Sequence, residues 1–146
     1  MTDAPAQLTL AHTNTIVDAA FAKGQALGLK PLSVAVLDPG GHLIAFQRQD
    51  GSSILRPQIA AGKAGGALAL GVSSRKIGEM AAERPSFVGS LGTIAPHGVI
   101  PAAGGVLIAG AGGAVIGAVG VTGDLSDNDE LCALAGVEAV GLKTRG

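Results

Sequence analysis

Lys63 stands out among the residues that could carry chemistry, because a helix at this point would give it no polar surroundings. The residues three and four positions away are apolar or small: Ile59, Ala60, Gly66 and Ala67. On a helix these positions share one face with Lys63. Two interpretations stay open. The ammonium snorkels to the edge of a sheet, or it anchors an anionic ligand or acts as an activated amine.

His97 and Glu130 are the two other candidates for catalysis, since both side chains can move protons. His97 lies in the loop of residues 95–101, and imidazole titrates near neutral pH. An exposed loop histidine explains His97 as well. Glu130 follows Asp129, a candidate ligand contact, and both acids are also explained as the cap of a helix that begins near Ser126.

Four further residues are candidates for ligand binding. Arg48 and Asp50 follow a predicted strand, where side chains commonly face a cleft, although the two could simply pair with each other. Gly104 and Gly105 permit close backbone approach, so their amides could hold a carboxylate. No sequence motif for zinc, a nucleotide or covalently attached haem is present, so no metal site is predicted.

Two predicted hairpins and several helices position these residues. In the first hairpin, two apolar runs flank Asp38-Pro39-Gly40-Gly41, and in the second they flank Gly112-Gly113. The rest of the chain is expected to form helices and one short strand: helices from about Thr9 to Gly28, Arg56 to Leu70, Ser73 to Ala82 and Ser126 to Leu142, and a strand near Val99. Hairpins predict an antiparallel sheet.

Residues 85–123 contain no Lys, Arg, Asp or Glu, which raises the question of a membrane segment. A membrane helix needs about twenty continuous apolar residues. Pro101 and several glycines instead divide this segment into runs of strand length, and no Trp or Tyr exists to form an interfacial belt. We therefore expect a buried hairpin whose two faces are covered by helices or by a partner subunit, and no membrane insertion.

Composition sets further limits. The chain has 146 residues, enough for one domain spanning residues 1–146, and a net charge of -1 with 14% charged residues gives no basic surface for nucleic acid. A mean hydropathy of +0.46 favours a homo-oligomer that hides apolar surface. Cys132 is alone, and the N-terminus lacks the features of a secretory signal, so a cytoplasmic location is expected.

Several motifs together resemble the GlcG/HbpS family, also called the haem-degrading domain family. They are V-L-D-P-G-G-H-L-I-A-F-Q-R-Q-D-G, A-A-G-K-A-G-G-A, G-A-V-I-G-A-V-G-V-T-G and D-N-D-E-L-C-A-L-A-G. The resemblance covers about residues 8 to 142 and extends to the C-terminal domain of PduO-type proteins. It implies a profilin-like α/β (α+β) fold with about five antiparallel strands and flanking helices, assembled as dimers or higher oligomers. Lys63 matches the lysine of the family's A-x-x-K-A pattern.

The resemblance also implies a function. We expect a small-ligand-binding protein, with non-covalent haem or a role as a haem-degradation accessory as one version. The alternative is a catabolic enzyme (an isomerase, lyase or hydrolase) acting on a small carboxylated substrate. There Lys63 or Arg48 would hold the carboxylate, while His97 or Glu130 would move protons.

Overall fold

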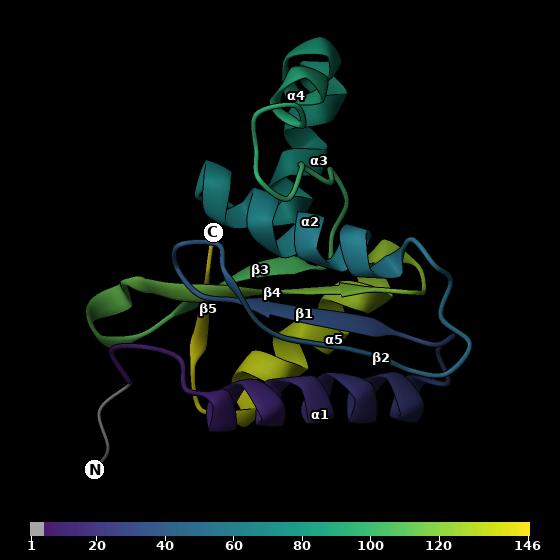
Figure 1. The fold of residues 1–146 in the computed structure, drawn as a ribbon, viewed down its shortest axis with the longest axis vertical. Helices are drawn as coiled ribbons and strands as arrows, with labels where there is room; N and C mark the ends of the chain where they lie inside the picture. Colours follow the sequence, from purple (N-terminus) through teal and green to yellow (C-terminus); the bar gives the residue numbers. More distant parts are fainter. Residues whose placement is uncertain (1–4) are drawn as a thin grey trace.

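The computed structural model describes residues 5–146 and shows one five-stranded sheet with helices on both faces (Figure 1). The strands are β1 (Ser33–Leu37), β2 (Leu43–Arg48), β3 (Gly105–Ala109), β4 (Val115–Thr122) and β5 (Lys143–Arg145). Their order in the sheet is β2-β1-β4-β3-β5, and every neighbouring pair is antiparallel. The predicted α+β fold with an antiparallel sheet is confirmed.

The five helices lie in two layers around this sheet. They are α1 (Leu10–Leu27), α2 (Arg56–Leu70), α3 (Ser74–Glu83), α4 (Pro85–Leu91) and α5 (Ser126–Ala139). Helices α1 and α5 cover one face and α2 covers the other, while α3 and α4 extend beyond α2, away from the sheet (Figure 1). Helices therefore cover both faces of the second hairpin, β3–β4.

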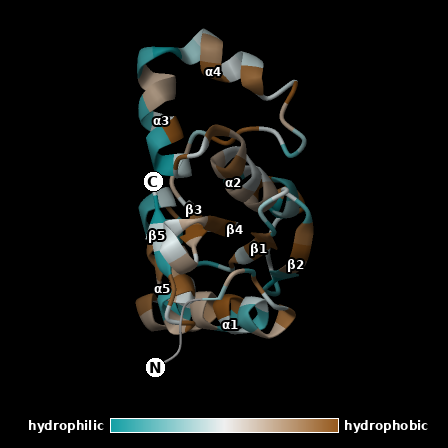
Figure 2. Cartoon of the chain, turned by 90° about the vertical axis from the view of Figure 1, so that its left-hand side faces the viewer, coloured by the Kyte–Doolittle hydropathy of each residue, from teal (hydrophilic) through white to brown (hydrophobic). Residues whose placement is uncertain are grey.

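The two faces of the sheet differ in the size of their side chains. Val34 and Val36 of β1 pack towards α1 and α5 with other large aliphatic residues, whereas Leu37 packs towards α2 with alanines. Figure 2 shows the apolar strands enclosed between the helices. On the α2 side a glycine brings the layers close together, because a Cβ at Gly120 of β4 would overlap the carbonyl oxygen of Ala60. Helix α2 consequently lies almost on the sheet backbone.

Local signals explain why these elements begin and end where they do. Helix α1 starts after Thr9, whose hydroxyl accepts a hydrogen bond from the amide of His12, and it ends at Gly28 in the left-handed conformation. The β1–β2 turn has Gly41 at a φ of 84°, which other residues rarely adopt. Both features were predicted from the sequence.

Three expectations about the elements were wrong or incomplete. No strand forms near Val99; within residues 5–146 this segment runs irregularly over α2, where Gly66 leaves room for the Val99 backbone. Pro85 does end the preceding helix, but it also starts α4, because proline suits the first turn of a helix. The fifth strand is β5 near the C-terminus, which the sequence did not reveal. None of the helices within residues 5–146 is long and apolar enough to cross a membrane.

Candidate functional site

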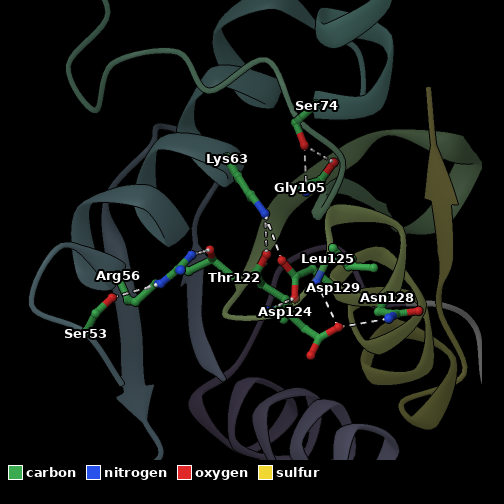
Figure 3. A network of polar contacts seen from close by, with 11 residues as sticks. Ser53, Arg56, Lys63, Ser74, Gly105, Thr122, Asp124, Leu125, Asn128 and Asp129 are labelled. Carbon is green, nitrogen blue, oxygen red and sulfur yellow. Dashed lines mark hydrogen bonds and ion pairs between the residues drawn. The ribbon is translucent and has the colours of Figure 1, made fainter. Parts of the chain in front are cut away.

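Lys63 is almost completely buried between α2 and β4, and its charge is matched by Asp129 at the start of α5. The Lys63 ammonium donates to Asp129 Oδ2 at 3.2 Å and to the carbonyl oxygen of Val121 at 3.0 Å. The side chains are 3% and 1% exposed. Figure 3 shows the lysine reaching from α2 past the end of β4 to the carboxylate. The pair thus joins three elements that are distant in sequence.

Burial dominates the electrostatics of this pair. Desolvation lowers the pKa of Lys63, and although Asp129 raises it in return, the net direction is downward. Desolvation likewise raises the pKa of Asp129 against the opposing attraction of Lys63. The second carboxylate oxygen, Oδ1, accepts from the amide of Asp124 at 3.0 Å, so both oxygens of Asp129 are used. The polar groups of Lys63 and Asp129 are therefore occupied by each other and by the backbone.

Gly104 and Gly105 both lie within contact distance of Lys63. A Cβ at Gly104 would approach the Lys63 ammonium to 2.8 Å, so only glycine leaves space for the lysine. The amide of Gly105 donates to the buried Ser74 hydroxyl at 2.7 Å. That amide is therefore already used. The structure brings Lys63, Gly104, Gly105 and Asp129 together, as a buried cluster.

Glu130 is next to Asp129 in sequence but lies on the surface side of α5. Its carboxylate accepts two hydrogen bonds from Arg75 Nε, at 3.0 and 3.1 Å, and Arg75 also bonds Asp127 at 2.5 Å. These contacts link α3 to the first turn of α5. Glu130 therefore pairs with Arg75, whereas Lys63 pairs with Asp129.

His97 lies on another side of α2. Its ring packs against Gly65, and its Nε2 is 2.6 Å from the carbonyl oxygen of Gly41. A carbonyl only accepts, so Nε2 donates to it. His97 also lines a small hollow of about 160 Å³ near the β1–β2 turn. It does not meet Lys63 or Glu130.

Arg48 and Asp50 lie together at the end of β2. Both line a surface hollow of about 370 Å³ formed by the chain from Arg48 to Ile54. No ion pair joins the two side chains within residues 5–146, nor does either bind another charged group there. Two of the predicted ligand contacts are thus available at one hollow.

Arg56 was not among the candidates predicted from the sequence, although it lies a few residues after the hollow that Arg48 and Asp50 line. It is half-buried at the start of α2, and its guanidinium donates from Nη1 to the Thr122 hydroxyl at 2.8 Å and from Nε to the Ser53 hydroxyl at 3.0 Å (Figure 3). A sequence signal existed, because Arg56 precedes Lys63 by seven residues, or two helical turns, and so shares its helix face.

Comparison with known proteins identifies the family. The family model for haem-degrading proteins of the HbpS-like type matches residues 8–138. The chain belongs to the HbpS-like family. No curated protein sequence matches it.

Three solved structures share the fold along nearly the whole chain. The Streptomyces reticuli HbpS double mutant is 29% identical, with a TM-score of 0.80, over 97% of this chain and 91% of that chain. The Klebsiella pneumoniae protein ORFY is 26% identical, with a TM-score of 0.82, over 97% and 96%. A PduOC complex with haem is 20% identical, with a TM-score of 0.85, over 97% and 100%. At that identity the last match concerns the fold alone.

Neither of two hollows within residues 5–146 fits haem. One of them, about 590 Å³, is lined by residues 109–113 and 141–143, which include no His, Cys, Met or Tyr to ligate iron. The hollow beside His97 is too small for a porphyrin. Cys132 is fully buried, and burial raises the pKa of its thiol to about 11. Neither hollow of the single chain therefore offers both enough space for haem and an axial ligand.

Proposed function

We propose that this chain is a small-ligand-binding protein that works in the cytoplasm as a homo-oligomer, with non-covalent haem as the ligand that its family suggests. The supporting observation is the hollow at the end of β2, where Arg48 and Asp50 are exposed and have no charged partner within residues 5–146. Its volume of about 370 Å³ lies within the range of small-molecule sites.

Haem requires more than this hollow. Because neither of the two hollows tested within residues 5–146 combines space for haem with an axial ligand, haem binding would need a site completed by a second copy. The apolar composition favours such an assembly, and large side chains remain exposed on the single chain, among them Ile54 and Leu55 beside the hollow. Haem binding and oligomerisation are therefore expected to occur together.

A titration with haemin tests this proposal. We expect a saturable shift of the Soret band at stoichiometric haemin, with light scattering reporting a dimer or larger species at the same protein concentration. Covalent attachment is excluded if acid–acetone extraction removes the haem. A chain that remains monomeric and shows no saturable shift would refute the haem version.

His97 favours a second candidate, the catabolic enzyme acting on a carboxylated substrate. With Nε2 donating to the Gly41 carbonyl, Nδ1 is the ring nitrogen left to act as a base at the wall of a hollow. Lys63 and Glu130 contribute less in this geometry, because Asp129 and Arg75 already occupy them. Turnover of a small carboxylated compound that survives His97→Ala unchanged would remove His97 from this role.

A further inference from the structure

A positive charge without a counter-charge lies at the beginning of α2. The Arg56 guanidinium is half-buried, yet among residues 5–146 its hydrogen-bond partners are only the hydroxyls of Ser53 and Thr122. Within residues 5–146 no carboxylate lies within ion-pair distance of it. The nearby buried carboxylate, Asp129, is taken by Lys63. Partial burial of an unpaired cation costs free energy, and a bound anion would recover it.

A buried hydroxyl beside Arg56 also has no partner. Ser33 is 0% exposed, and its Oγ has no hydrogen bond within residues 5–146. In the sheet Ser33 of β1 is directly opposite Thr122 of β4 and Arg48 of β2. Strand alternation places Ser33 on the same face as Leu37, which is the α2 face.

Opposite side chains on one face of an antiparallel pair are about 5 Å apart. The Ser33 side chain is therefore a cross-strand neighbour of the Thr122 side chain, whose hydroxyl accepts from Arg56. Buried hydroxyls are normally satisfied, so the Ser33 hydroxyl is an unused donor within residues 5–146.

The start of α2 also favours a negative charge. The residue that precedes this fifteen-residue helix is Leu55, which provides no side-chain cap, and the first turn contains no acidic residue. The partial positive charge of a helix N-terminus is therefore not offset by the chain itself. Arg56 adds a full charge at the same place.

We propose that Arg56, Ser33 and Thr122 form a carboxylate-binding site at the beginning of α2, with Arg48 at its rim. The argument for a carboxylate is the number of unused donors. Arg56 Nη2 has no hydrogen bond within residues 5–146, and neither has the Ser33 hydroxyl, so two donors match the two oxygens of one carboxylate. The proposal rests on the proposed ligand-binding function and names the chemical group that the ligand presents. The carboxylate belongs either to a haem propionate or to a free small acid.

Three probes separate these sources: haemin, haemin dimethyl ester, in which both propionates are esterified, and succinate. Haemin and its ester are followed by the Soret band, and succinate by calorimetry. If a propionate occupies the site, haemin binds and its ester binds at least about tenfold more weakly. If a free acid occupies it, succinate binds while haemin and its ester behave alike.

Two substitutions test the residues. Arg56→Gln is expected to lower the affinity for the carboxylate probe about 10- to 100-fold, because a charged hydrogen bond is lost. Ser33→Ala is expected to weaken it about 3- to 10-fold while the ligand-free protein is as stable as the wild type or more so, since an unsatisfied hydroxyl has been removed. Lys76→Gln removes an exposed charge on α3 and serves as the matched control, with affinity unchanged.

The outcomes distinguish the two proposals. If the wild type binds a probe but neither Arg56→Gln nor Ser33→Ala weakens it, the carboxylate site is refuted and ligand binding stands. If no probe binds the wild type, both are refuted. If Arg56→Gln fails to fold, Ser33→Ala still decides, because a purely structural serine would leave affinity unchanged.

Discussion

Replacement of Lys63 by methionine should reveal how much the fold depends on the buried pair. Methionine keeps most of the apolar stem but leaves the 1%-exposed Asp129 with only the Asp124 amide as a partner. Removing one member of a buried ion pair typically costs about 3–5 kcal/mol. The lower figure applies here, because burial already lowers the pKa of Lys63 and raises that of Asp129, so part of the attraction is offset. We expect Lys63→Met to reduce the free energy of unfolding by about 3 kcal/mol.

A loss of about 3 kcal/mol corresponds to a fall in Tm of about 10 °C for a chain of this size. Denaturant unfolding followed by circular dichroism measures it, at one fixed protein concentration because an oligomer's stability depends on concentration. Lys76→Met is the matched control on the surface of α3 and should change stability by less than about 0.5 kcal/mol.

The double variant Lys63→Met/Asp129→Asn gives the sharper result. Asparagine keeps the acceptor oxygen for the Asp124 amide and removes the unpaired charge, so the second substitution should restore about 1–2 kcal/mol. The reasoning is refuted if Lys63→Met costs less than about 1 kcal/mol, or if Asp129→Asn makes the lysine variant still less stable.

Three further predictions concern packing, acid stability and thiol reactivity. Gly120→Ala should cost at least about 3 kcal/mol in denaturant unfolding, because the new methyl group overlaps the Ala60 carbonyl, whereas Gly89→Ala on α4 meets nothing within 4 Å and should be neutral or stabilising. Hydrogen bonds from its neighbours lower the pKa of Asp124 from its ordinary 3.8 to about 2, so stability should fall as pH drops from about 4 to 2, and Asp124→Asn should flatten that fall; an unchanged slope contradicts the assignment. Cys132 should resist Ellman's reagent at pH 8 in the native protein and react fully in guanidinium, and rapid native labelling would contradict its burial.

Elements with local signals could be predicted from the sequence. The Thr9 cap, the Gly28 stop and the glycine turns at Gly41 and Gly112 each act within a few residues, and the helices and hairpins they bound were predicted correctly. Strand β5 could not be predicted, because its three residues are exposed and form a strand only by pairing with β3.

The candidate site was only partly predictable for the same reason. Lys63 drew attention through its small, apolar helical neighbours, but its partner Asp129 is 66 residues away and no local pattern joins them. His97 contacts Gly65, two residues after Lys63, and positions two apart project to nearly opposite sides of a helix. The unpaired Ser33 hydroxyl depends on the register between strands, which a single sequence does not reveal.

The strand order has a consequence for synthesis on the ribosome. Strand β1 lies inside the sheet between β2, its neighbour in sequence, and β4, which begins 78 residues after β1 ends, at Val115 after Leu37. While the intervening segment is being translated, one edge of a strand whose five residues are all buried in the folded protein has no partner. The nascent chain therefore passes through a stage in which this edge could pair with another chain. A ribosome-associated chaperone would be most useful after α2 has emerged and before β4 follows.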